Sequence, residues 1–310
     1  MTMVGGVAAV GVGFLALVGG AGWLVRGAAA LARRFGLSPL VIGLTVVAFG
    51  TSAPELLVSL VSVLTGKGDV AVGNVLGSNT ANVLLILGAS AMVRPLPSSR
   101  SALRVDLPIG LALVAAVAAF GWDGHISRWE AAVLLAGFGV FMVAAFLRRQ
   151  ALDLGGDVRL DSARSSLLRV AGGLAGLVVG AELLVRGATV LARAAGLSEA
   201  LIGLTLVAVG TSLPELATSV VAAHRGQSEI SVGNILGSNV FNIGWVLGLA
   251  YLIRPGSIAP VLARHDALVA GGASLLLGVF LAVRHRLGRA EGAVLLGFYA
   301  LYVGFLFWRG

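Results

Sequence analysis

The sequence contains no cysteine, and only 12% of its 310 residues are charged. The absence of cysteine excludes disulfide bonds and thiolate metal sites. A soluble domain carries about 25% charged residues, so the low charge argues against a chain that folds in water. Histidine is also scarce. Each of the four lies near the end of an apolar segment, which leaves no obvious buried imidazole ligand: His125, His224, His265 and His285.

Long apolar stretches make up most of the remainder, with 58% hydrophobic residues and 45 glycines. Many stretches exceed the roughly 20 residues that a helix needs to cross a bilayer. Only helices and closed barrels satisfy the backbone inside lipid, and barrel strands would alternate in polarity, which these stretches do not. We therefore predict an all-α integral membrane protein. Residues 1–24 lack a basic leading region, so we expect a first span there rather than a signal peptide.

The two halves of the chain repeat one another. A shift of 160 residues aligns 41–96 with 201–256, and 27 of these 56 positions are identical without a gap. We predict a first repeat at 1–147, a cytoplasmic linker at 148–166 and a second repeat at 167–310. The most similar blocks are GLTVVAFGTSAPEL (43–56) with GLTLVAVGTSLPEL (203–216), and VGNVLGSNTAN (72–82) with VGNILGSNVFN (232–242).

Each half is predicted to contain five spans. Because five is odd, the halves would cross the membrane in opposite directions, which gives ten transmembrane helices as two inverted five-helix repeats. Inverted repeats are typical of secondary transporters, whose substrate sites lie between the repeats. The predicted spans are 4–25, 38–65, 70–93, 103–121, 129–147, 167–192, 198–223, 230–253, 266–283 and 290–308.

The basic residues predict the orientation of these spans. With the N-terminus outside, 15 of the 22 basic residues fall on the cytoplasmic side, as the positive-inside rule requires. The net charge of +8 then reflects orientation in a plasma or inner membrane, and no nucleic-acid partner is expected. The 15 residues are Arg26, Arg33, Arg34, Arg94, Arg100, Arg104, Arg148, Arg149, Arg159, Arg164, Arg169, Arg225, Arg284, Arg286 and Arg289.

Two glutamates, Glu55 and Glu215, lie near the middle of long apolar segments at equivalent positions of the repeat. An ionisable residue at membrane depth is costly and usually marks an ion or substrate pathway. The alternative is a structural acid that is protonated or paired with arginine, but no basic residue lies in the same stretch of either span. Glu182 differs, because Arg186 lies one turn away and favours an ion pair on the helix surface. A gating role for Glu182 stays open.

Proline precedes both glutamates, at Pro54 and Pro214. Proline removes a backbone donor and bends a helix, and irregular backbone at membrane depth is tolerated where it lines a cavity. The alternative is that the Gly-Pro pattern bends the helix only for packing. Hydroxyl groups on the same turns are candidate ligands: Thr51, Ser52, Thr211 and Ser212.

The next span of each half carries serine and asparagine four residues apart, and therefore on one helix face. These residues could equally hold helices together by hydrogen bonds. All the candidates supply hard oxygen atoms, which suit Ca²⁺ rather than zinc or copper. One Ca²⁺ or two monovalent ions would balance the two carboxylates, so competition for one site would give exchange. The pairs are Ser78 with Asn82, and Ser238 with Asn242.

The repeated blocks resemble a known family. GTSAPE (50–55), GTSLPE (210–215) and the two GSNxxN blocks (77–82, 237–242) are similar to the α-repeats of the sodium/calcium exchangers, in the calcium/cation antiporter superfamily. The resemblance covers nearly the whole chain. It implies ten helices in two inverted halves, an ion core built by spans 2, 3, 7 and 8, and alternating access as spans 1 and 6 slide across that core.

The resemblance also implies roles for single residues. Glu55 and Glu215 would ligate calcium with the carbonyl groups of two threonines, and further carbonyls, hydroxyls and amides would hold sodium or flank the centre. Several family members have aspartate in place of Asn242, and some have an acid in place of Asn82, so potassium dependence and ion ratio stay open. The GTSxPE pattern favours sodium over protons. The resemblance implies that the calcium-binding carbonyl groups are those of Thr51 and Thr211. Sodium would be held by the carbonyl groups of Ala48 and Ala208 and the hydroxyl groups of Ser52, Ser212, Ser78 and Ser238, while Asn82 and Asn242 would flank the centre.

The predicted function is thus a Ca²⁺/Na⁺ antiporter without enzymatic activity or a resident cofactor, whose partners are these ions and the lipid bilayer. Antiport coupled to H⁺ or K⁺ is an alternative. A cation channel could use the same oxygens, but it would conduct without a gradient of a second ion. An intramembrane hydrolase would need a nucleophile with a base, and the histidines lie at the wrong depth. Oligomeric state is not predicted.

Overall fold

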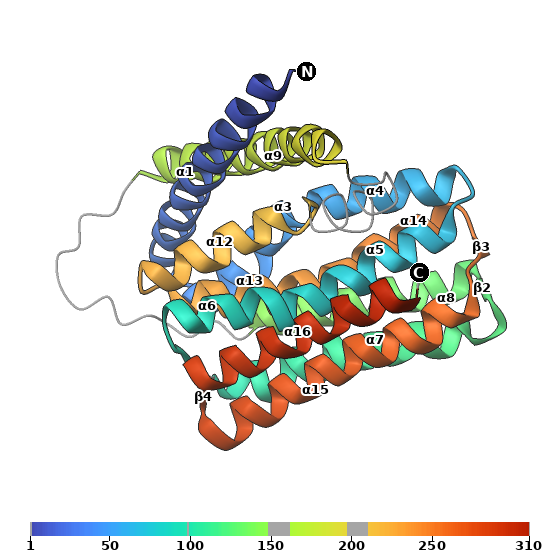
Figure 1. Cartoon of the computed structure of the whole chain (residues 1–310). Helices are drawn as coiled ribbons and strands as arrows, with labels where there is room; N and C mark the ends of the chain where they lie inside the picture. The colour runs from blue at the N-terminus through green and yellow to red at the C-terminus, as the bar shows by residue number, and fades with distance from the viewer. Residues whose placement is uncertain (1, 98, 148–161, 197–209, 310) are drawn as a thin grey trace.

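The computed structural model describes residues 2–97, 99–147, 162–196 and 210–309, and nearly all of them are helical (Figure 1). Within these residues, eight helices are long and apolar enough to cross a membrane, and the bent pair Pro39–Thr51 and Ala53–Leu64 makes a ninth candidate. The predicted span at 198–223 lies partly outside the described residues, and Leu213–His224 is its described part. The prediction of an all-helical membrane architecture is confirmed.

The helices and strands of the first half lie within residues 3–147. In chain order they are α1 (Met3–Phe35), α2 (Pro39–Ile42), η1 (Gly43–Val47), α3 (Ala48–Thr51), α4 (Ala53–Leu64), α5 (Gly68–Ala81), η2 (Asn82–Leu87), α6 (Gly88–Val93), β1 (Leu96–Pro97), η3 (Ala102–Asp106), α7 (Leu107–Phe120), η4 (Gly121–Asp123), β2 (His125–Ile126) and α8 (Arg128–Leu147).

The second half has corresponding elements. They are α9 (Ala163–Ala194), α12 (Leu213–His224), α13 (Ser228–Val240), η6 (Phe241–Leu247), α14 (Gly248–Ile253), β3 (Gly256–Ser257), η7 (Leu262–Asp266), α15 (Ala267–Arg284), β4 (Arg286–Leu287) and α16 (Arg289–Arg309). The short strands join the halves, because β1 pairs antiparallel with β4 and β2 pairs antiparallel with β3.

Two predicted boundaries are corrected. The first helix continues past residue 25 to Phe35, through alanine, leucine and arginine, which favour helix. It ends where Gly36 adopts a left-handed conformation (φ 62°) and its N–H bonds back to the last turn. The predicted linker 148–166 is too long at its C-terminal end, since Ser162 caps α9, which begins at Ala163. Residues 148–161 lie outside the described part.

The GSN-bearing helices lie at the centre of the molecule. In the most apolar 18-residue stretch of each helix, 72% of the residues are buried for Gly68–Val93 and 83% for Ser228–Ile253, against 22% for α1 and 28% for α9. Both central helices contain a π-helical stretch, η2 and η6, which begins at or next to a predicted asparagine ligand. A π turn adds one residue to a helical turn and often marks a functional site.

Helices α1 and α9 cross each other closely on one side of the bundle (Figure 1). A Cβ on Gly13 would lie 2.7 Å from the carbonyl oxygen of Gly180, and one on Gly20 would lie 2.8 Å from that of Gly173, so only glycine fits. Residue numbers rise along α1 as those of the contacting residues fall along α9, so the two helices are antiparallel. We call these contacts the glycine seam; it consists of Gly6, Gly13, Gly20, Gly27, Gly173, Gly180 and Gly187, spaced seven apart within each helix.

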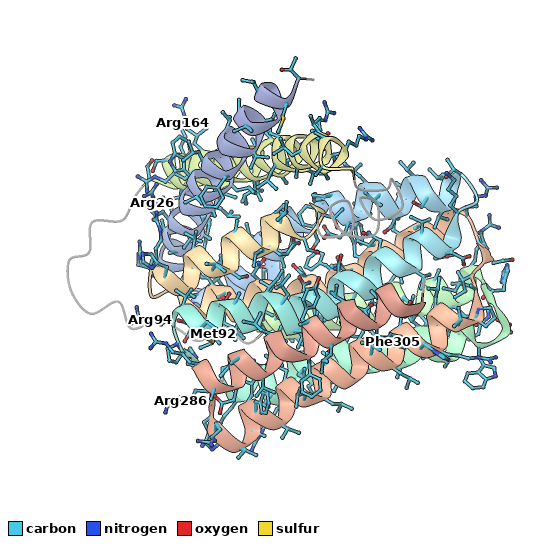
Figure 2. The ribbon with its side chains drawn as sticks, in the orientation of Figure 1. Arg26, Met92, Arg94, Arg164, Arg286 and Phe305 are labelled. Carbon is cyan, nitrogen blue, oxygen red and sulfur yellow. The ribbon has the colours of Figure 1, made fainter. Side chains whose placement is uncertain are left out.

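Arginines gather at one end of the bundle. Figure 2 shows Arg26, Arg94, Arg164 and Arg286 along the left end of the view. These four come from both halves, and the sequence predicts all of them on the cytoplasmic side. Their common location agrees with that prediction, because basic residues that share a membrane face must share an end of the bundle.

Candidate ion-binding site

Both glutamates lie in the first turn of a helix that starts at a break in the chain. The break between α3 and α4 bends the chain by 48°. Ser52 and Ser212 occupy the two equivalent breaks with almost the same backbone angles (φ −82°, ψ 6° and φ −87°, ψ 3°). The partial positive charge of a helix N-terminus stabilises a nearby carboxylate. Each glutamate thus lies at the N-terminus of its helix, and both glutamates are buried.

The two glutamate side chains meet in the centre of the molecule. Glu55 is 0% exposed and Glu215 is 1% exposed, and they are close enough for their charges to interact. The hydroxyl group of Ser52 donates a hydrogen bond to Oε1 of Glu215 (3.2 Å), and that of Ser212 donates to Oε1 of Glu55 (3.4 Å). Each half of the chain therefore supplies a hydroxyl group to the carboxylate of the other half.

The predicted serines of the central helices belong to the same cluster. The hydroxyl group of Ser212 lies 3.1 Å from that of Ser78. Ser238 lies beside Glu215, and both Ser78 and Ser238 are buried. The structure thus brings together residues 134 positions apart in the chain around the two carboxylates.

The predicted asparagines are held by two further asparagines. Nδ2 of Asn82 donates to Oδ1 of Asn239 (2.9 Å), and Nδ2 of Asn242 donates to Oδ1 of Asn79 (3.0 Å). Because the amide nitrogens are engaged in these bonds, the orientation of each side-chain oxygen is fixed. Asn79 also donates to the backbone carbonyl of Asn239 (3.0 Å), which links the two central helices.

Four buried carboxylate and amide oxygens of the cluster have no hydrogen-bond partner among the described residues, and neither does the hydroxyl group of Ser238. The four oxygens are Oε2 of Glu55, Oε2 of Glu215, Oδ1 of Asn82 and Oδ1 of Asn242, two pairs related by the 160-residue shift. An unsatisfied buried polar atom costs about 1–3 kcal/mol, so four such acceptors in one cluster need a compensating ligand. A hard cation would supply that compensation, because carboxylate and amide oxygens are its preferred ligands.

The remaining predicted ligands are placed less uniformly. Thr51 is buried and Thr211 is partly exposed. The carbonyl oxygen of Ala48 accepts a hydrogen bond from the N–H of Ser52 (3.0 Å), so it is engaged within its own segment of the chain. Ala208 lies outside the described residues.

A second pair of asparagines, absent from the sequence prediction, supports the threonines. The hydroxyl of Thr51 donates to Oδ1 of Asn234 (3.1 Å), and that of Thr211 donates to Oδ1 of Asn74 (3.4 Å). Each amide nitrogen then donates to a serine one helix away, Ser219 or Ser59, at 3.0 Å. The signal was present in the sequence, because VGN is identical in both halves at 72–74 and 232–234.

Two other acids lie apart from the glutamate pair. Glu182 forms an ion pair with Arg186 on the exposed surface of α9, which confirms the predicted helix-surface pair. Asp106 is 1% exposed, although the sequence placed it at the start of a span. It lines a very small cavity with Asn79 and Asn239, and the lining of this cavity includes neither Glu55 nor Glu215.

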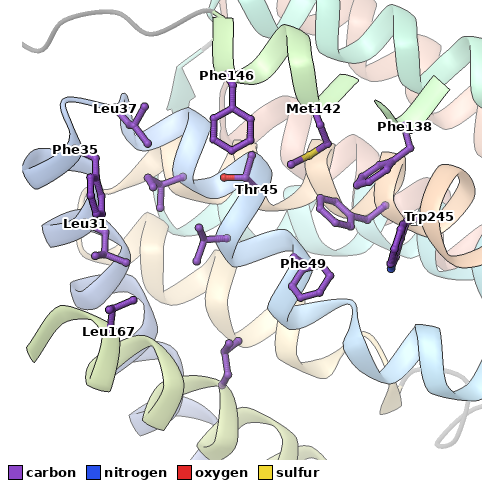
Figure 3. A pocket seen from close by; sticks show the side chains of 14 residues that line it. Leu31, Phe35, Leu37, Thr45, Phe49, Phe138, Met142, Phe146, Leu167 and Trp245 are labelled. Atoms are coloured by element: carbon purple, nitrogen blue, oxygen red, sulfur yellow. The ribbon is translucent and has the colours of Figure 1, made fainter. Parts of the chain in front are cut away.

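A large apolar cavity lies apart from the glutamate pair. It encloses about 710 Å³ and is lined almost wholly by apolar side chains of α1, η1, α8, α9 and η6, including Phe35, Phe138 and Trp245 (Figure 3). Its one hydroxyl group, on Thr45, donates to the carbonyl of Val41 (2.7 Å). The cavity holds no charged side chain, so it cannot balance the charge of a cation.

The chemistry of the site follows from its ligand set. Among the described residues, no three His, Asp or Glu side chains come together as a metal cluster. The site instead offers two carboxylates with hydroxyl and amide oxygens. This set can bind hard cations reversibly, whereas it lacks the nitrogen and sulfur ligands that zinc and copper favour.

Comparison with known proteins relates both halves of the chain to one family. The family described as sodium/calcium exchanger protein matches residues 5–147 and again 165–308. The chain is 39% identical over 311 residues to the inner membrane protein YrbG of Escherichia coli, covering 96% of this chain and 95% of that protein. It is 32% identical to the sodium/calcium exchanger MaX1 of Methanosarcina acetivorans, covering 96% and 97%.

A solved structure shares the fold. The sodium-calcium exchanger NCX_Mj, soaked with 10 mM Na⁺ and no Ca²⁺, superimposes with a TM-score of 0.87 at 34% sequence identity. The match covers 98% of this chain and 99% of that one.

Proposed function

The chain belongs to the sodium/calcium exchanger protein family, and we propose that it exchanges Ca²⁺ for Na⁺ across the membrane at the site between Glu55 and Glu215. It is a multi-pass membrane protein and a cation antiporter. The observation that carries the proposal is a set of four buried carboxylate and amide oxygens, from Glu55, Glu215, Asn82 and Asn242, that have no hydrogen-bond partner within the described part of the chain.

The charge of the site supports exchange. Two carboxylates give it a charge of −2 when both are ionised, which one Ca²⁺ or two Na⁺ ions would neutralise. Neutral hydroxyl and amide oxygens complete the shell without changing that balance, since Ca²⁺ takes six to eight oxygen ligands. Either cargo therefore satisfies the same atoms, and neither can bind fully while the other occupies them.

Alternating access supplies the mechanism we propose. Ten helices in two inverted five-helix repeats would enclose the site, and α1 with α9 would slide across the remaining helices to expose it to one face or the other. The glycine seam supports this role, because it makes the two helices a closely packed pair. The N-terminus would lie outside and the linker in the cytoplasm, which the gathering of arginines at one end supports (Figure 2).

Transport into proteoliposomes tests the proposal. Purified protein is reconstituted in vesicles loaded with Na⁺, K⁺ or an acidic buffer. The vesicles are diluted into a solution that contains radioactive Ca²⁺ but not the loaded ion, and the uptake of Ca²⁺ is followed. We expect uptake driven by the outward Na⁺ gradient, and none when Na⁺ is equal on both sides.

Two outcomes would change the assignment. Uptake indifferent to Na⁺ but driven by a proton gradient would contradict Na⁺ as the counter-ion, and a requirement for K⁺ together with Na⁺ would revise the ion ratio. Ca²⁺ flux that runs down its own gradient with no counter-ion would indicate a channel and overturn the proposal altogether.

A further inference from the structure

A basic cavity lies away from the ion site, where α1 and α9 meet the connection between α12 and α13. It encloses about 330 Å³, and four of its seven lining residues are arginines, with no acidic residue among them. We call it the arginine pocket. Its lining residues are Val25, Arg26, Ala29, Arg33, Arg169, Arg225 and Gln227.

The charges in the pocket are poorly balanced. Within the described residues, Arg26, Arg33 and Arg225 form no ion pair. Partial burial, followed by the nearby charge of Arg26, lowers the pKa of Arg225 from its usual value. Like charges held this close repel one another, so an anion that enters the pocket relieves repulsion as well as forming new contacts.

Comparison of the two halves shows how the pocket arises. Arg186 in the second half is neutralised by Glu182, four residues before it. The equivalent of Arg186 is Arg26, but the equivalent of Glu182 is Gly22. The first half therefore lacks the neutralising acid.

The glycine also admits a further cation. A Cβ on Gly22 would lie 2.7 Å from Nη2 of Arg225, so the guanidinium group of Arg225 packs directly over the backbone of α1 at this glycine. One difference between the repeats thus removes an acid and makes room for an arginine. This asymmetry distinguishes the arginine pocket from the equivalent place in the repeat, where Glu182 neutralises Arg186.

We propose that the arginine pocket binds a phosphate group, either in the headgroup of an anionic lipid or as free phosphate. Guanidinium groups match the geometry of phosphate oxygens and bind them through paired charge-assisted hydrogen bonds. Basic pockets between transmembrane helices are known to suit anionic headgroups. Because its arginines come from α1, α9 and the end of α12, a bound phosphate would tie the α1–α9 pair to the rest of the protein.

Binding is tested on the full chain in neutral detergent, by thermal unfolding during titration with phosphatidylglycerol, phosphatidylcholine or inorganic phosphate. We expect phosphatidylglycerol or phosphate to raise the unfolding temperature, whereas phosphatidylcholine does not. Arg225→Gln should raise the apparent Kd about tenfold, the scale of one charge-assisted contact. Arg286→Gln removes one charge from the same end outside the pocket and should leave the Kd unchanged.

A second pair of variants covers the case in which Arg225→Gln does not fold. Gly22→Glu restores the acid of the second half, and Gly22→Gln has the same length without the charge. Both displace the flexible end of Arg225, so a weaker response in the Glu variant than in the Gln variant isolates the loss of positive charge.

The outcomes separate the two sources of phosphate. A response to phosphatidylglycerol alone assigns a lipid headgroup, and an equal response to inorganic phosphate assigns the free ion. An equal response to phosphatidylcholine, or an equal loss in Arg286→Gln and Arg225→Gln, would overturn the proposal. None of these measurements depends on transport, so the result stands apart from the proposed exchange.

Discussion

Each carboxylate of the candidate ion site accepts a hydrogen bond from a hydroxyl group of the opposite half of the chain. Ser52 donates to Glu215 and Ser212 donates to Glu55. The second oxygen of each carboxylate has no hydrogen-bond partner among the described residues. One oxygen is therefore held in place by the protein, and the other is available to a cation.

Removal of either carboxylate should abolish tight Ca²⁺ binding. We expect Glu55→Gln and Glu215→Gln each to weaken Ca²⁺ affinity by about 100-fold or more, because breaking a buried charge pair by removing one partner costs about 3–5 kcal/mol. Isothermal titration calorimetry of the purified protein measures the change. Glu182→Gln is the matched control, since Glu182 is exposed and already paired with Arg186 on α9.

The Glu182→Gln control also defines the result that would contradict the two-glutamate site. If Glu182→Gln weakens Ca²⁺ binding as much as Glu55→Gln, or if Glu215→Gln binds normally, the two-glutamate site is wrong.

At the scale of elements, the sequence predicted which residues lie together better than it predicted the shapes of the helices that carry them. Glu55 and Glu215 could be identified because an ionisable side chain at membrane depth is costly and usually functional. Pro54 indicates the break before α4. The π-helical stretches η1, η2 and η6 were not predicted, since a π turn changes the register of a helix by one residue and leaves no composition signal. The asparagines Asn79 and Asn239 were also missed, because their role depends on contacts between halves.

The packing of the glycine seam is sensitive to added volume. Gly20→Ala should lower the unfolding free energy by about 1–3 kcal/mol, because its Cβ would press on the backbone of α9 and overpacking costs that much. Thermal unfolding in detergent measures the change.

A neighbouring glycine provides the control for helix propensity. A Cβ on Gly19 would meet nothing within 4 Å, so Gly19→Ala should be neutral or stabilise by up to about 1 kcal/mol. Equal effects at Gly19 and Gly20 would show that α1 and α9 do not pack through this seam.

For the molecule as a whole, orientation in the membrane is the property that the sequence predicts most directly. The prediction of orientation rests on the alternation of the predicted spans and on the distribution of arginine along the chain. The structure places arginines of both halves at one end of the bundle (Figure 2). The arginine pocket, by contrast, could not be predicted. Its residues come from three separate regions of the chain, and none of them is unusual where it stands in the sequence.

The lack of native cysteine makes orientation easy to test. We expect Lys67→Cys, between α4 and α5, to react with a membrane-impermeant maleimide on intact cells, because this connection is predicted outside. Arg286→Cys, between α15 and α16, should react only after the membrane is opened. The wild-type chain provides a background free of thiols. The reverse labelling pattern would contradict the proposed orientation.

The seam between α1 and α9 has one further consequence for exchange. One helix of the pair comes from each half, and their backbones touch directly, so neither can shift without carrying the other. Under the proposed mechanism, the displacement that uncovers the ions toward one compartment is the same displacement that covers them from the opposite compartment. A single rigid pair would then serve as both gates, and the two compartments would never be connected by a continuous aqueous path.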